Sequence, residues 1–331
     1  MIEWLTSQLP AIRPIERRSE ADYYGASDLI GAALGYATPP RSVASWKHGV
    51  SYERTMRAPE LLLTEGNRAT RHLVANEWQA TRLRRAGYLR VHAVGVPFLY
   101  SEPPDTKRLP RSLLVMPAHH VLNSTHAFDE EGYTESLRAL RDRFDPVIAC
   151  VSATCTREGN WTRTLEKVGI PWILGADSVD RNALRRMRKI FAMFEFMTTN
   201  TLGSHVAYAA YSGCRVSIWG PYAQVRLEDY RNVPWYQKNW KRASELIECY
   251  TESHVRRSHP MLFREPWNAE DLRIWAEPFV GHSFRRGPFE VGRLLGWTPI
   301  GQGEALVHCA ARRLADLGRG AMRRFRAVSV S

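Results

Sequence analysis

Residues 198–221, TTNTLGSHVAYAAYSGCRVSIWGP, contain the end of one strand, a short apolar helix and a second strand. The pattern predicts strands at 196–200 and 214–220, with the helix at 204–213 between them. The first turn of a helix has free N–H groups and the positive end of the helix dipole. Because hydroxyls, a glycine and a histidine gather at this turn, we expect it to bind a phosphate. Simple capping by Ser204 or Thr201 is the alternative, and it would use the same groups.

The same alternation of strands and helices extends back from this stretch to residue 111. Short apolar runs predict further strands, and amphipathic segments with apolar residues at helical spacing predict the helices between them. Strands joined by single helices through short connections are typical of a parallel sheet covered by helices on both faces. The expected strands are 112–118, 146–153 and 171–176, and the expected helices are 130–144, 160–169 and 181–195.

A second, smaller α/β unit is predicted ahead of the first, in the first hundred residues. Strands are expected at 42–46, 71–76 and 90–98, with a helix at 77–87. The Pro-rich segment 101–110 has the composition of a linker, and the aromatic sequence after Pro221 is expected to form helices that pack back on both units. We therefore expect an α/β protein with two Rossmann-like domains facing across a cleft and a C-terminal helical extension. The expected parts are a small domain at 1–105, a larger one at 111–222 and the extension, with its basic tail, at 223–331.

The chain of 331 residues has a net charge of +12, which favours an anionic partner. No apolar run is long enough to cross a bilayer, and the N-terminus does not resemble a signal peptide, so a cytoplasmic protein is expected. The basic segment 311–326 is either a solvated helix or a peripheral helix attracted to an anionic membrane, and both interpretations stay open. Nucleic-acid binding is an alternative from charge alone. It is not the expectation, because the arginines cluster away from the strand ends and no nucleic-acid motif is present.

Several cofactor and metal chemistries have no motif in this sequence. The five cysteines (150, 155, 214, 249 and 309) form no CxxC pair, so neither a disulfide framework nor a zinc site is expected. The chain also lacks HExxH, a P-loop and a GxGxxG turn between a strand and a helix. We therefore expect no metal and no cofactor, and a phosphate held by helix dipole, hydroxyls and histidine.

Polar side chains follow nearly every strand of the larger unit, where ligands of open α/β sheets bind. Five such positions in register predict a polar ligand that lies across this edge of the sheet. The residues expected to hold its phosphates are Thr199, Gly203, Ser204, His205 and His119. The residues expected around the nucleoside or sugar are Thr154, Asp177, Ser178, Gly220 and Tyr222.

A second candidate site follows the strand expected at 42–46, where the chain reads Lys47-His48-Gly49. The glycine allows a sharp turn that would expose His48 at the strand end. A histidine can take a proton from a hydroxyl near neutral pH, so His48 is the expected catalytic base. Other carboxylates in the same unit remain alternatives: Glu16, Glu20, Asp22, Asp28 and Glu65.

Several of these stretches resemble the GT-B glycosyltransferases. ANEWQATRLRRAGYLRVHAVGVPF (75–98) resembles the last part of their N-terminal domain, and KHG (47–49) resembles a turn that faces the acceptor. MPAHH (116–120), GADS (175–178) and the stretch 198–221 are similar to the donor-binding half of bacterial capsule and lipopolysaccharide transferases. The resemblance implies a nucleotide-sugar donor on the larger domain and an acceptor in the cleft near His48. Deprotonation of an acceptor hydroxyl by His48 for in-line attack on the donor implies inversion.

The resemblance and the motifs together predict a metal-independent, inverting glycosyltransferase that builds a bacterial surface polysaccharide. The donor would be a UDP- or CMP-sugar, and the acceptor a growing glycan or a lipid-linked glycan. A nucleotide-sugar epimerase or hydrolase is the nearest alternative, because the same architecture can host it. A basic nucleic-acid-binding protein is the alternative from a different class.

Overall fold

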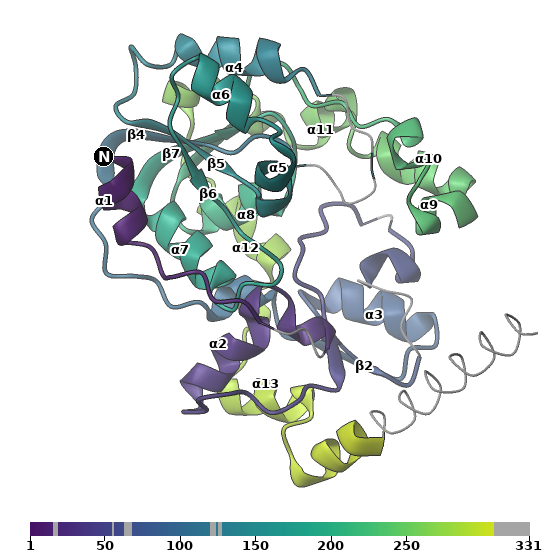
Figure 1. The fold of residues 1–331 in the computed structure, drawn as a ribbon. Helices are drawn as coiled ribbons and strands as arrows, with labels where there is room; N and C mark the ends of the chain where they lie inside the picture. The colour runs from purple at the N-terminus through teal and green to yellow at the C-terminus, as the bar shows by residue number, and fades with distance from the viewer. Residues whose placement is uncertain (16–18, 55, 63–67, 120–123, 125–127, 308–331) are drawn as a thin grey trace, which may run out of the picture.

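The computed structural model describes residues 1–331 except 16–18, 55, 63–67, 120–123, 125–127 and 308–331. It contains two α/β units, each built on a parallel sheet (Figure 1). The smaller sheet has the order β1-β2-β3, with β1 (Ala44–Trp46), β2 (Arg71–Val74) and β3 (Arg90–Ala93). The larger sheet has the order β6-β5-β4-β7-β8, and all its neighbouring strands are parallel. Its strands are β4 (Leu109–Val115), β5 (Val147–Val151), β6 (Trp172–Leu174), β7 (Phe194–Thr199) and β8 (Arg215–Ile218).

The larger sheet is covered by helices on both faces, as the alternating pattern predicted. Along β4, Leu113 and Val115 lie in one core while Leu114 lies in the other, because successive strand residues point to opposite faces. One core contains α4 (Glu130–Arg138) and α6 (Thr162–Lys167), and the other contains α7 (Ala183–Met193) and α8 (Ser204–Tyr211). The strands are apolar on both sides for this reason.

The smaller sheet is covered in the same way. Leu83 of α3 (Glu77–Arg85) packs with Val74 and Val91 on one face. The other face of the sheet lies in the main core of the molecule, together with Ile30 of α2 (Ala26–Ala33). Both faces of this sheet are therefore buried, although each of its strands is short.

Several elements differ from the sequence expectation. The strand expected at 90–98 ends at Ala93 and is followed by a 3-10 helix at Pro97–Tyr100, and β4 begins at Leu109, within the segment expected as a linker. The helix expected at 130–144 ends at Arg138 and continues as turns, and a helix that was not expected, α5 (Ala153–Glu158), precedes α6. The Ser152 hydroxyl starts α5 by accepting the Cys155 N–H at 3.3 Å, so Thr154 lies inside a helix rather than in a loop. The described chain also contains the helices α1 (Ile2–Ser7), α9 (Pro234–Lys238), α10 (Trp240–Glu248), α11 (Glu252–Ser258), α12 (Arg273–Val280) and α13 (Pro288–Leu295), and residues 299–307 are helical as well. Short 3-10 helices are η1 (Glu20–Gly25), η2 (Ala58–Leu61), η3 (Pro97–Tyr100), η4 (Leu227–Tyr230), η5 (Pro260–Leu262), η6 (Pro266–Asn268) and η7 (His282–Phe284).

The two ends of the described chain each cross to the other unit. Residues 11–15 run along 179–182 of the larger unit, where the Ile15 N–H bonds the Val179 carbonyl at 2.7 Å. Near the other end, α12 packs on α8 of the larger unit and α13 packs on α2 of the smaller one. The domain expected at residues 1–105 included residues 11–15, which here contact the larger unit. The basic segment 311–326 lies outside the described residues. None of the described helices is both long and apolar enough to cross a membrane.

Candidate functional site

The loop after β1 is hydrogen-bonded to the first turns of α8, so the two candidate sites lie together. The Val50 N–H donates to the Ser204 hydroxyl at 2.9 Å. The Tyr52 hydroxyl donates to the Gly203 carbonyl at 2.9 Å and accepts the Ala207 N–H at 3.2 Å. The carboxyl end of a strand in one sheet thereby meets the helix that follows a strand in the other.

His48 takes part in the same junction through its backbone. Its carbonyl accepts a hydrogen bond from the Tyr208 hydroxyl of α8. Gly49 has no left-handed backbone. A Cβ there would lie 3.5 Å from the Ser204 hydroxyl, which is an ordinary van der Waals contact. The backbone of this loop therefore does not require glycine in the way expected from the sequence.

The start of α8 has a geometry that only part of the sequence argument anticipated. Gly203 is the N-cap residue, and no side chain caps the helix, so neither Ser204 nor Thr201 has the capping role considered above. A Cβ on Gly203 would lie 2.8 Å from Nδ1 of His205, which explains the need for glycine. The Ser204 hydroxyl accepts from Val50, and its own O–H makes no hydrogen bond among the described residues.

His205 turns back toward the strand and pairs with Thr199. Its Nε2 lies 3.0 Å from the Thr199 hydroxyl, and Thr199 is fully buried. Burial, with the charge of His119 as a smaller cause, lowers the pKa of His205 to about 3. The ring is therefore neutral near pH 7, with one nitrogen able to donate. Asn200, a residue that the sequence analysis did not name, holds the chain just after the neighbouring strand β4. Its side-chain oxygen accepts the Ala118 N–H at 2.9 Å, one residue before the exposed His119.

The residues expected around the nucleoside are engaged in contacts within the protein. Asp177 forms an ion pair with Arg157 at 3.0 Å, and the Ser178 carbonyl accepts the Tyr24 N–H at 3.0 Å. Thr154 lies in the first turn of α5. Thr154 follows the carboxyl end of β5, and Asp177 and Ser178 follow the carboxyl end of β6.

Gly220 and Tyr222 have structural contacts of their own after β8. Gly220 has a φ of 80°, and a Cβ there would lie 3.1 Å from the Tyr133 ring. The Tyr222 hydroxyl donates to the Tyr250 carbonyl at 3.0 Å, and its ring stacks on Phe263. Tyr222 thus joins the larger unit to the C-terminal helices.

The His48 side chain lies between two tyrosine rings that the sequence analysis did not single out. Tyr23 stacks on it with ring centroids 5.6 Å apart, and Tyr24 meets it edge-on at 4.8 Å. Its Nδ1 is buried and has no hydrogen-bond partner among the described residues. Burial, with Lys47 as a smaller cause, lowers the pKa of His48 to about 4. The ring is therefore in the neutral form that a general base requires, although its basicity is low.

Lys47 is itself buried below this loop. Its ammonium donates to the Ser51 hydroxyl at 2.8 Å and to the Glu60 carbonyl at 3.3 Å. Burial lowers the pKa of Lys47 to about 8, against the opposing attraction of Glu60. The lysine thus holds the loop in place and adds positive charge beneath His48.

The alternative bases are placed less favourably. Asp22 is fully buried, and its two oxygens accept from the Ser19 N–H at 2.7 Å and the Ser27 hydroxyl at 2.6 Å. Asp28 is paired with Arg181 at 2.8 Å, and burial raises its pKa. Glu20 accepts a hydrogen bond from Ser45. Glu16 and Glu65 lie outside the described residues.

Two neighbouring cavities share lining residues of the smaller unit, and Tyr52 lines one of them. The first, of about 530 Å³, is lined by residues of the smaller unit and the C-terminal region, including Tyr52, Trp78, His259, Phe279 and His282. The second, of about 820 Å³, shares Arg54, Glu77 and Trp78 with it and adds Arg57, Arg82 and Arg85. Neither is lined by the predicted phosphate residues. In the sequence, the aromatic residues after 221 and the arginines of 77–87 were the features from which these two cavities could have been predicted.

The fold and this junction define a class: an α/β protein with two parallel sheets whose strand ends meet where the two units touch. No family model and no curated protein matches the chain. Among solved structures, the pneumococcal O-GlcNAc transferase GtfA in complex with UDP and GlcNAc is similar with a TM-score of 0.31. The identity is 13%, over 71% of this chain and 45% of that one. A UDP-N-acetylglucosamine 2-epimerase is similar with a TM-score of 0.29 at 12% identity, over 64% of this chain and 56% of that one. The chain thus spans about half the length of each, and its likeness to these GT-B fold proteins is weak.

Proposed function

We propose that this protein is a metal-independent, inverting glycosyltransferase that transfers a sugar from a nucleotide-sugar donor to a glycan or lipid-linked acceptor. The observation that carries the proposal is the junction between β1 and α8. There, the loop containing His48 is hydrogen-bonded to the first turns of the helix that follows β7. The loop that contains the candidate base lies beside the helix start that would bind phosphate, and this proximity supports the proposal.

The donor phosphates would meet the start of α8. Helix N–H groups and the helix dipole favour negative charge at this point, and Gly203 leaves the backbone open to close approach. The free O–H of Ser204 and the neutral ring of His205 supply further donors, and Thr199 orients the ring. His119, exposed after β4, would add a donor from the neighbouring strand. Fixed donors of this kind stabilise the charge that develops on a leaving nucleotide.

The acceptor hydroxyl would lose its proton to His48. A diphosphate bound at α8 would favour the protonated imidazole and raise the pKa of His48 from its low value. His48 would thus become an effective base only when the donor is bound. The acceptor chain would extend toward the aromatic cavity behind Tyr52, because sites for organic ligands are lined mainly by aromatic and apolar side chains with a few polar groups.

The experiment is an incubation of the purified protein with UDP- and CMP-sugars, without added Mg²⁺ or Mn²⁺, in the presence and absence of glycan acceptors. The proposal predicts that donor is consumed only with an acceptor and that a lengthened glycan forms. Accumulation of an isomeric nucleotide sugar without any acceptor would instead identify an epimerase. Release of free sugar at the same rate with and without acceptor would identify a hydrolase. Either result would replace the proposal.

A further inference from the structure

Three side chains with metal-binding chemistry meet at the contact between the smaller unit and the C-terminal helices. Glu53 follows the Tyr52 loop, Cys249 is the C-cap residue of α10, and His254 lies in α11. The carboxylate oxygen, the thiol sulfur and an imidazole nitrogen all lie within 4.8 Å of one another. Nε2 of His254 is 2.9 Å from Oε1 of Glu53, while the Cys249 sulfur lies 3.5 Å from the Glu245 carbonyl oxygen. In the part of the chain that the structure describes, no other group of three is placed in this way.

These distances are close to those of a tetrahedral site. Bonds of about 2.0–2.3 Å to nitrogen, oxygen and sulfur place the ligand atoms about 3.4–3.6 Å apart. His254 and Glu53 would need to separate by roughly half an ångström. The thiol lies within 4.8 Å of both and would need to approach by at most about 1.3 Å. The side chains of His254 and Glu53 are partly exposed, at 25% and 20%, which leaves room for rotamer adjustment.

A small cavity adjoins the cluster. Its volume is about 40 Å³, and its lining includes Glu53, Cys249 and Tyr250. This is room for a metal ion with one water, because a single water needs about 10–15 Å³ of such volume. Three protein ligands and one water would complete four coordination.

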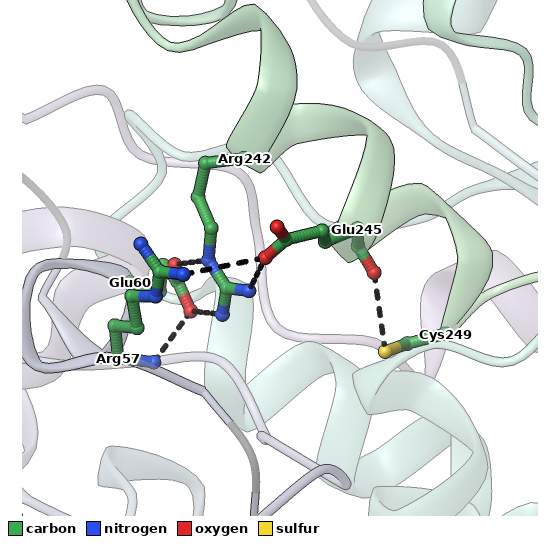
Figure 2. Close-up of polar contacts among 5 residues, drawn as sticks. All are labelled: Arg57, Glu60, Arg242, Glu245 and Cys249. Carbon is green, nitrogen blue, oxygen red and sulfur yellow. Dashed lines mark hydrogen bonds and ion pairs between the residues drawn. The ribbon is translucent and has the colours of Figure 1, made fainter.

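The surroundings already hold the two segments together. Arg242 of α10 forms a two-pronged ion pair with Glu60, and Glu245 pairs with both Arg242 and Arg57 (Figure 2). Figure 2 also shows Cys249 one helical turn after Glu245. The side chain of Glu60 is 4% exposed, so this ion pair is shielded from solvent. The ion pairs therefore fix α10 against residues 57–60, and the ligands are carried on positions that are already juxtaposed.

We propose that Glu53, Cys249 and His254 form a site for a thiophilic divalent cation of the Zn²⁺ class, which ties the Tyr52 loop to the C-terminal helices. The combination of thiolate and imidazole selects Zn²⁺ over Mg²⁺ or Ca²⁺, which prefer sites made of oxygen ligands only. The site is separate from the phosphate-binding turn of α8 and takes no part in the proposed transfer. In the sequence, two of the three ligands have the spacing Cys249-x4-His254, which is not a CxxC pair.

The test uses the full chain, freed of metal by a chelator that is then removed, and Co²⁺ as a spectroscopic probe. One equivalent of Co²⁺ is expected to produce a thiolate-to-metal charge-transfer band, and Zn²⁺ is expected to abolish that band by displacement. Cys249→Ser should remove the band. His254→Ala and Glu53→Gln should each weaken Co²⁺ binding on the order of tenfold or more, since changes even to groups behind the ligands cost 10–100-fold. Glu252→Gln is the matched control, because Glu252 lies in α11 two residues before His254 and its carboxylate pairs with Arg256.

Retention of the band in Cys249→Ser would assign the signal to another thiol and overturn the proposal. Absence of stoichiometric Co²⁺ binding to the folded wild-type chain would do the same. Circular dichroism shows which variants fold. If Cys249→Ser does not fold, binding to His254→Ala and Glu53→Gln decides, and affinity equal to that of Glu252→Gln in both would refute the site. Zn²⁺ should also raise the thermal midpoint of the wild type and leave that of Cys249→Ser unchanged.

Discussion

Replacement of Tyr52 by phenylalanine tests whether the hydrogen bonds between the two units contribute to the free energy of unfolding. The ring stays and only the hydroxyl is lost, so packing against Trp275 and Phe279 is kept. The hydroxyl makes two hydrogen bonds to α8, one to the Gly203 carbonyl and one from the Ala207 N–H. Tyr52 is 7% exposed, and Ala207 is fully buried, so water cannot readily replace the bond to Ala207.

The expected loss follows from these two bonds. Each intramolecular hydrogen bond contributes about 0.5–1.5 kcal/mol net, and a buried donor left unpaired costs about 1–3 kcal/mol. Gly203 is partly exposed, so its carbonyl can recover a bond to water. We therefore expect Tyr52→Phe to lower the free energy of unfolding by about 2 kcal/mol, or roughly 30-fold in the unfolding equilibrium.

The assay is urea unfolding followed by tryptophan fluorescence, with the midpoint and the slope compared between variants. Tyr133→Phe is the matched control with the opposite expected sign. The Tyr133 hydroxyl is buried in the larger unit and has no hydrogen-bond partner in the part of the chain that the structure describes. Its removal should therefore be neutral or raise stability by about 1 kcal/mol. Equal midpoints for Tyr52→Phe and wild type would refute the argument that these bonds hold the units together.

Three further predictions concern the candidate site. Ser204→Ala and Thr199→Ala should each weaken nucleotide binding by about 1–3 kcal/mol, or roughly 5–150-fold, measured by calorimetry; unchanged affinity in both would make the turn purely structural. His48→Asn should lower turnover by about 10²–10⁴-fold and leave nucleotide affinity nearly intact, and near-normal turnover would reduce His48 to a positioning role. The third concerns pH. Native His205 stays neutral down to about pH 3, whereas an unfolded histidine binds a proton below about 6.5. The unfolded state then holds more protons, so stability falls with falling pH across that window, by about 2 kcal/mol at pH 5 from this residue. His205→Gln should flatten the dependence of the urea midpoint between pH 7.5 and 5, and an undiminished slope would show that another group causes it.

The larger sheet was predictable because its strands follow simple physical rules. Apolar runs such as 146–153 are buried on both faces, and the helices between strands have one apolar side. Residues that begin or end elements were also readable, such as Gly213 after α8, which has a φ of 85°. The smaller sheet was found by the same reasoning, although its strands have only three or four residues.

The side-chain environment of the site was less accessible to sequence reasoning. Tyr23 and Tyr24 reach His48 because η1 contains a backbone kink, with Tyr24 at a φ of 58°, and no periodic pattern reveals such a kink. The bond from Val50 to Ser204 joins residues 154 positions apart. Long-range pairs of this kind depend on how whole units dock, and local patterns do not contain that information.

The crossing of the C-terminal chain has a mechanical consequence. Between α12 on the larger unit and α13 on the smaller one, Gly281 has a φ of 75°, and a Cβ there would lie 1.9 Å from the Ala75 carbonyl oxygen. The chain is thus pressed against the end of β2 at the point where it passes from one unit to the other. Any residue larger than glycine at position 281 would collide with the Ala75 carbonyl and strain the passage of the chain between the units.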